Sequence, residues 1–354
     1  MSIQEDISTA DAHGRTHAVL ADLREAKRLH PDWIAAATSA KEPSEPPQMF
    51  RQLVATGRQD LSAARLYEGH INALQLVKRL GQPAQIERVC SLAGDGSLLG
   101  VWGADAPGDP ATIRGSRIDG AKVFASGSDS LALAIVAAKD IDKKTQLFLM
   151  DMEQHRGRTD QSWWRAVGMR ATHSGALRLA DFELSDEDRL GAPGQYETQP
   201  FFGAGAIRFV SAQLGGLLAV WDAARQHLIA TGRHIDPTQA LRLGTMAADI
   251  EAAYAHVTHA YGRVAPAIDW EGSGGHPADA LIADMARVVV EDAAGRCISL
   301  AGKAVGCAGW METHPLCQAV QDLSVYLCQP APDAARARAG IAAAEGSYRM
   351  TFDA

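Results

Sequence analysis

The sequence has few cysteines and lacks the arrangements that mark a metal site or a disulfide framework. Its five cysteines form no Cys-x-x-Cys pair and stand at no metal-ligand spacing to a histidine; they are Cys90, Cys297, Cys307, Cys317 and Cys328. An odd number of thiols in a chain of 354 residues indicates reduced cysteines. We therefore expect a cytoplasmic protein without a metal centre.

Signals for a membrane or for nucleic acid are also scarce. The first residues, MSIQEDISTADAHGR, contain neither the basic nor the apolar region of a signal peptide. The sequence has no uninterrupted apolar run of about 18 residues, the length that a membrane-spanning helix needs. Acidic residues outnumber basic ones by 42 to 34, which gives a net charge of -8 and no basic footprint for nucleic acid. We expect neither a membrane nor nucleic acid as a partner.

What the sequence does contain is typical of a globular protein with many helices. Hydrophobic residues make up 47% of the chain and charged residues 21%, with many alanines and leucines. A chain of this length can form a large core and favours two or three packed lobes.

The hydrophobic pattern changes twice along the chain, which predicts three domains. Residues 1–90 carry apolar side chains at helical spacing, as in THAVLADLREAKRL and LYEGHINALQLVKRL. Residues 91–195 have short apolar runs divided by turns, as in LALAIVAA and QLFLMDM, which indicates a middle β-barrel-like lobe. Residues 196–354 return to long helical stretches, separated by Gly232–Pro237 and by EGSGGHP, and predict an antiparallel helix bundle with a last helix after Asp333. The expected fold class is α+β.

Three blocks of sequence resemble the acyl-CoA dehydrogenase superfamily. The first is KVFASG (122–127), which is similar to that family's Lys-x-Trp-Ile-Thr-Asn strand. The second is VGMRATHSGALRLADFELSDEDRLGAPGQY (167–196), and the third is the bundle, where Arg208, Gln239, Arg287 and the run from Lys303 to Asp322 keep the family's order. The resemblance implies an FAD-dependent oxidoreductase that assembles as a homodimer or homotetramer.

The resemblance also implies a set of flavin contacts. Phe124 would lie against the flavin ring, and Ser126 would contact the flavin through its hydroxyl. Further cofactor contacts are expected in the bundle, from Arg233, Gln239, Lys303 and Gly306. Arg233 would replace the family's Arg-x-x-Phe-Gly element, which reaches the FAD pyrophosphate of a neighbouring subunit. Lys303 replaces a Gln and can serve a phosphate as a point charge.

The base that this family uses is missing. Its usual Glu would fall on Pro330, and the position that a minority branch uses is Ile207. Removing a proton beside a thioester needs a poised carboxylate. We therefore predict an acyl-CoA dehydrogenase-like oxidoreductase, acting on CH–CH groups of an acyl or modified small-molecule substrate, whose base is non-standard or absent.

Two other functions remain open. One is a flavin-dependent monooxygenase that uses reduced flavin and oxygen, because a branch with this activity has an aromatic-x-Ser-Gly strand similar to FASG. The histidines which that branch places after its last conserved helix correspond here to Tyr326 and Gln329. The other is a binding or assembly scaffold of the same fold that has lost its chemistry.

Three further residues are candidates for the site. His70 lies on an amphipathic helix of the lobe that would cover the site, and it is the best replacement acid/base; its alternative role is a structural histidine. Arg208 is expected to bind substrate. Trp102 ends an apolar run, so we expect it either to line the substrate cavity or to pack in the core.

Overall fold

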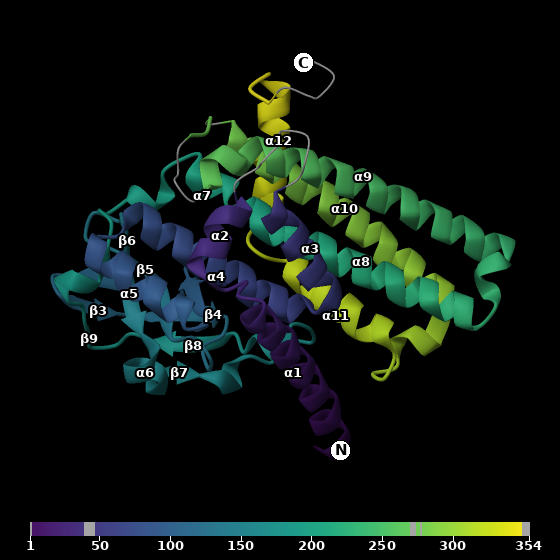
Figure 1. Cartoon of the computed structure of the whole chain (residues 1–354), viewed down its shortest axis with the longest axis horizontal. Coiled ribbons are helices and arrows are strands. Elements are labelled where there is room, and N and C mark those ends of the chain that lie inside the picture. Colours follow the sequence, from purple (N-terminus) through teal and green to yellow (C-terminus); the bar gives the residue numbers. More distant parts are fainter. Residues whose placement is uncertain (1, 39–46, 270–273, 277, 349–354) are drawn as a thin grey trace.

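The computed structural model describes residues 2–38, 47–269, 274–276 and 278–348, with side chains placed from residue 12 onward. Figure 1 shows the β part on one side, the helix bundle on the other, and α4 between them. The chain therefore has the expected order of helices, then strands, then helices.

In the described residues before the first strand, the chain forms five helices. They are α1 (Ser2–Glu25), α2 (Pro31–Thr38), α3 (Gln48–Gln59), α4 (Leu61–Leu80) and α5 (Pro83–Gly94). Asp60 caps α4, because its Oδ1 accepts a hydrogen bond of 2.7 Å from the amide of Ala63. Most residues of α4 are buried, including polar ones, because it contacts the β part through β1 and the bundle through α8. Helix α4 is the central connection of the molecule.

The strands form two sheets. The seven-stranded sheet contains β1 (Leu99–Trp102), β2 (Thr112–Arg114), β3 (Arg117–Asp119), β5 (Leu133–Lys139), β6 (Thr145–Asp151), β9 (Phe182–Glu183) and β10 (Arg189–Leu190). The second sheet has the order β4 (Ala121–Ala125), β8 (Gly175–Arg178), β7 (Thr159–Asp160). Strand β1 pairs parallel to β5, whereas β5 and β6 form a long antiparallel pair whose buried positions fill the core. The runs LALAIVAA and QLFLMDM are confirmed as strands.

The predicted domain boundaries differ in detail from the elements. Helix α5 continues to Gly94, so a boundary at residue 90 would cut through it. We propose that the first boundary lies in the turn between Gly94 and Leu99, where the helix ends and β1 begins. We propose that the second boundary stays at residue 195, in the short 3-10 turn Gln195–Glu197 between β10 and the bundle.

The bundle consists of α8 (Ala206–Ala230), α9 (Pro237–Ile268), α10 (Asp279–Val305) and α11 (Pro315–Leu327), preceded by α7 (Phe201–Ala204) and followed by α12 (Pro332–Ala344). The predicted turn at Gly232–Pro237 and the predicted last helix are confirmed. The turn predicted at EGSGGHP falls mostly outside the described residues.

Glycines allow α3 and α8 to cross closely. A Cβ on Gly215 would lie 2.3 Å from the carbonyl oxygen of Val54, and one on Gly57 would lie 2.3 Å from that of Ala212. Real Cβ atoms do not approach backbone oxygens to this distance, so a side chain at either position would separate the helices. Gly215 is therefore a packing residue.

One helical stretch, Phe201–Ala230, is long and apolar enough to cross a membrane by length and composition. Two-thirds (67%) of its most apolar window is buried inside the protein. It includes α8, which packs against α3, α9, α10 and α11, so its apolarity is that of a central bundle helix. The sequence pattern does not mark it as an uninterrupted run because Arg208 and Gln213 lie within it.

Candidate functional site

The end of strand β4 presents an open aromatic surface. Phe124 is 44% exposed although it belongs to a strand, and its backbone has a φ of +56°. Its ring meets Trp163 edge to face, with 5.0 Å between ring centroids, and Trp164 at 6.2 Å. Trp163 is also 39% exposed. We call Phe124, Trp163 and Trp164 the aromatic cluster; it leaves apolar ring surface uncovered where a flat ligand can pack.

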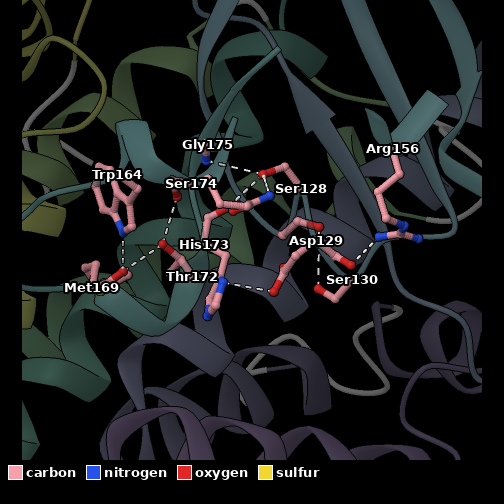
Figure 2. A network of polar contacts seen from close by, with 12 residues as sticks. Ser128, Asp129, Ser130, Arg156, Trp164, Met169, Thr172, His173, Ser174 and Gly175 are labelled. Carbon is pink, nitrogen blue, oxygen red and sulfur yellow. Dashed lines mark hydrogen bonds and ion pairs between the residues drawn. The ribbon is translucent and has the colours of Figure 1, made fainter. Parts of the chain in front are cut away.

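Three buried hydroxyls lie beside this surface. The hydroxyls of Ser126 and Ser174 are 2.8 Å apart, and those of Thr172 and Ser174 are 2.7 Å apart. Thr172 is 2.7 Å from the carbonyl oxygen of Met169, to which it donates, as Figure 2 shows. Trp164 donates to the same carbonyl through its indole nitrogen at 2.9 Å. We call Ser126, Thr172 and Ser174 the hydroxyl cluster; it is joined to the aromatic cluster through Met169.

The turn that carries Thr172 has an unusual backbone. Met169 and His173, on either side of a 3-10 turn (Arg170–Thr172), both adopt the left-handed conformation. The amide of Met169 donates to the carboxylate of Asp322 on α11. Burial raises the pKa of Asp322 to about 6, against hydrogen bonds from Gln318 and Met169 that lower it. The bundle thus holds the turn through one buried carboxyl group.

A second polar group fixes the other end of this turn. His173 and Asp129 form a pair, with 2.9 Å between Nδ1 and Oδ2. The hydrogen bond to Asp129 raises the pKa of His173. The ring of His13 on α1 packs on His173 with 4.4 Å between centroids, and burial followed by repulsion from His173 lowers the pKa of His13. Helix α1 therefore docks on the turn through paired imidazoles.

A buried ion pair lies on the face of α4 that meets the bundle. Glu68 accepts hydrogen bonds at Oε1 from the guanidinium of Arg65 and, at 3.2 Å, from the hydroxyl of Tyr326 on α11. Only 7% of Glu68 is exposed. We call Arg65, Glu68 and Tyr326 the Glu68 cluster. Glu68 belongs to no recognisable sequence motif; the available signal is the polar series Arg65, Glu68, Asn72 and Gln75, which repeats at helical spacing in a mostly apolar helix.

Arg208 extends this polar face. Its guanidinium donates to Gln75 at 2.6 Å and to Asn72 at 2.8 Å, and burial lowers its pKa. Its Nε has no hydrogen-bond partner, and the hydroxyl of Tyr261 likewise has none. A buried donor without an acceptor costs free energy, so each of these atoms is suited to an acceptor atom of a ligand or a water.

His70 has a position that favours the structural role over the acid/base role among the two expected for it. It is fully buried; its Nε2 lies 2.8 Å from the carbonyl oxygen of Leu29, and its Nδ1 accepts from the amide of Leu99 at 3.2 Å. Burial lowers its pKa to about 4. Both ring nitrogens are therefore used by the backbone, and His70 joins three segments as a neutral side chain.

Trp102 also lies in the core and does not line an open surface. It is 2% exposed, and its indole nitrogen donates to the carbonyl of Ser126 at 3.0 Å. It thereby holds the backbone of Ser126, directly after the end of β4. Of the two roles expected for Trp102, the structure supports packing.

The other residues predicted to bind cofactor lie at the far end of the bundle, which we call the bundle tip and define by Arg233, Gln239, Lys303 and Gly306. Gln239 is 3.2 Å from Arg242, and the same guanidinium is 3.0 Å from the carbonyl oxygen of Lys303. Arg233 is exposed in the 3-10 turn after α8. In Figure 1 this end points away from β4.

Neither usual base position offers a carboxylate. Ile207 is fully buried, and Pro330 presents its carbonyl oxygen to Arg287. Among the residues that the structure describes, no group of three or more His, Cys, Asp or Glu side chains is arranged to hold a metal ion.

Comparisons with solved structures identify the fold. The dibenzothiophene monooxygenase TdsC from Paenibacillus sp. A11-2, in complex with FMN and indole, is 18% identical and covers 98% of this chain and 99% of its own, with a TM-score of 0.75. The 3-HSA hydroxylase from Rhodococcus sp. RHA1 is 18% identical over 98% of this chain and 96% of its own, with a TM-score of 0.72. Butyryl-CoA dehydrogenase from Megasphaera elsdenii is 17% identical over 97% and 98%, with a TM-score of 0.72. No protein-family model and no curated protein matches the sequence. The chain has the acyl-CoA dehydrogenase-like fold.

Proposed function

We propose that this protein is a flavin-dependent oxidoreductase that works as a monooxygenase on a small aromatic substrate. The observation that carries the proposal is the open aromatic cluster beside the hydroxyl cluster, at the place where the sequence resemblance puts the flavin ring. The apolar residues at both usual base positions disfavour dehydrogenation of an acyl thioester.

The residues present fit the ring part of a flavin better than its adenosine end. Phe124 offers a ring face. Ser126, Thr172 and Ser174 offer hydroxyls that can give up hydrogen bonds to one another and form them with the polar edge of the flavin ring. The pyrophosphate element is reduced to Gly232, with Arg233 as the nearest replacement. We therefore favour FMN over the FAD that the resemblance implies. When bound, the flavin would supply the two-electron chemistry, and the chain would hold the ring and the substrate.

We propose that Arg208 contacts the substrate, as the sequence predicts. Its buried Nε lacks a partner, which supports a role in holding an acceptor atom of a bound molecule. Indole is a reasonable first probe, because TdsC has been solved with FMN and indole. All five cysteines are unpaired, which fits the cytoplasmic location that we propose.

Replacing Phe124 by alanine is expected to weaken flavin binding about fivefold or more, because a stacked ring contributes about 1 kcal/mol beyond the area that it buries. The measurement is a fluorescence titration of FMN and of FAD into the purified protein. Phe202→Ala is a matched control, since Phe202 has the same 44% exposure on α7. A protein that binds neither flavin would instead be a scaffold.

The reaction itself is tested by oxygen consumption with reduced FMN and an aromatic substrate. Product that contains one added oxygen atom supports the proposal. Release of peroxide alone, without a modified substrate, contradicts the proposal. Reduction of the protein's flavin by an acyl-CoA also contradicts it and supports an acyl-CoA dehydrogenase instead.

We further propose a homodimer or homotetramer formed through the bundle tip. Five large apolar side chains are exposed there: Ile229 (47%), Ile235 (78%), Leu241 (74%), Trp310 (54%) and Met311 (62%). Such a cluster is unusual on a monomer and typical of a contact surface. Trp310→Asp is expected to shift the protein to monomer in analytical ultracentrifugation, whereas Ile141→Asp, at an exposed position (88%) in the β part, leaves the assembly unchanged. A parent protein that is already monomeric at micromolar concentration would contradict this.

A further inference from the structure

Acidic side chains are rare in the interior of this protein, and most of those present have a structural partner. In the described part of the chain four are buried: Glu68, Asp279, Asp284 and Asp322. Asp322 holds the amide of Met169, and Asp284 forms a paired hydrogen bond with Arg338 of α12. Asp279 accepts from the amide of His276 at the start of α10. Glu68 differs because its partners are a guanidinium and a phenol hydroxyl.

The two partners of Glu68 are a tyrosine hydroxyl that keeps its proton and a guanidinium that carries a positive charge. Burial, followed by the charge of Glu68, raises the pKa of Tyr326 well above its ordinary value, so its hydroxyl keeps its proton and donates it to the carboxylate. Arg65 balances the carboxylate charge from the other side. The side chains of Arg65 and Glu68 keep 18% and 9% of their surface exposed, so the cluster opens on the Arg65 side.

Helix α4 connects this cluster to the aromatic and hydroxyl clusters. Ser62, in the first turn of α4, lies 4.0 Å from the sulfur of Met169. Leu66 packs against Gly127, directly after Ser126, where a Cβ would come within 3.1 Å of its side chain. Glu68 follows two residues later on the same helix and is turned toward the bundle. The carboxylate therefore lies on the helix that contacts the strand end where the flavin ring is proposed to bind, on the face of that helix turned toward the bundle.

We propose that Glu68 and Tyr326 are the proton-transfer pair of this site, serving a neutral substrate that carries a weakly acidic O–H or N–H, such as a phenol or a ring N–H. The substrate proton passes to the Tyr326 oxygen as the Tyr326 proton passes to Oε1 of Glu68. One O–H or N–H bond of the substrate breaks, one O–H bond forms on Glu68, and Tyr326 ends unchanged. Arg65 then faces the substrate anion, because its carboxylate partner has become neutral. The proton transfer itself does not depend on the proposed function; only the oxidation that would follow it does.

The pair can be tested without flavin by an ionisable dye. 4-Nitrophenol is titrated into the protein at a pH below the dye's own pKa, and its yellow phenolate band is recorded. The parent protein is expected to bind the dye as phenolate. In Glu68→Gln and in Tyr326→Phe the ionised fraction of the bound dye falls about tenfold or more, since a hydrogen bond to a charged group is lost.

Glu291→Gln and Tyr254→Phe are the controls, because both lie outside the Glu68 cluster. Tyr326→Phe removes a single oxygen atom and keeps the ring, so the test survives if Glu68→Gln does not fold. Equal phenolate bands in Tyr326→Phe and parent overturn the proposal, as does a parent protein that shows no bound phenolate. Because no flavin is added, these outcomes are independent of the flavin titration and of oxygen consumption.

Discussion

His70→Ala is expected to lower the free energy of unfolding by about 3–5 kcal/mol. The substitution leaves the carbonyl of Leu29 and the amide of Leu99 without partners in the interior, at about 1–3 kcal/mol each, and adds a cavity. Urea unfolding of parent and variant at neutral pH measures the effect. His234→Ala, at an exposed position, is the control and stays within about 0.5 kcal/mol of the parent.

The same variant should also change the pH dependence of stability. The pKa of His70 is about 4 in the folded protein, below the ordinary value of 6.5 that holds in the unfolded chain. The unfolded chain therefore binds a proton first, and this group's contribution is complete above pH 6.5 and lost as the pH falls toward about 4. The parent should lose up to about 3 kcal/mol relative to His70→Ala across this window. If the variant unfolds like the parent but abolishes turnover, the structural role of His70 is wrong.

Gly168→Ala should destabilise the protein by about 3 kcal/mol and impair flavin binding together. A Cβ at this position would lie 2.1 Å from the carbonyl oxygen of Gln321, a backbone atom of α11 that cannot move away alone. The methyl group would push the turn from α11 and strain the bond between Met169 and Asp322. Thermal unfolding and FMN titration measure the two effects.

Gly157→Ala is the matched control, because nothing lies within 4 Å of a Cβ there. A Gly168→Ala protein that keeps parental stability would show that α11 and the turn are not held in contact. Normal stability with lost flavin binding would instead place Gly168 in direct contact with the ligand.

The sequence predicts the fold well because the fold depends on patterns that are local. Long apolar periodicities give the bundle helices, and short apolar runs between turns give β5 and β6. The motif KVFASG correctly indicates a strand, although the open ring of Phe124 follows from its left-handed backbone and from Trp163, which a strand pattern does not reveal.

The site is less predictable because its residues meet only in three dimensions. Glu68 and Tyr326 are separated by 258 positions, and neither forms a motif with its neighbours. The amphipathic pattern around His70 predicts a helix near the site, but helical spacing does not show that both its ring nitrogens meet backbone groups of Leu29 and Leu99. The helical spacing of polar residues shows that α4 has a polar face. Only the tertiary contacts show which side chains of α4 are free to take part in a reaction.

The backbone of the turn from Met169 to His173 makes the N-terminal helix more than a peripheral segment. Two non-glycine residues in left-handed conformation cost about 1–3 kcal/mol each, so the surroundings must enforce them. Asp322 restrains one end, and His13 packs on the other. A shortened protein that begins after α1 would lose the packing of His13, which would leave the ring of His173 held by Asp129 alone and the hydroxyls of Thr172 and Ser174 less firmly oriented. Trimming the first helix to obtain a more compact sample would thus alter the geometry of the very site under study.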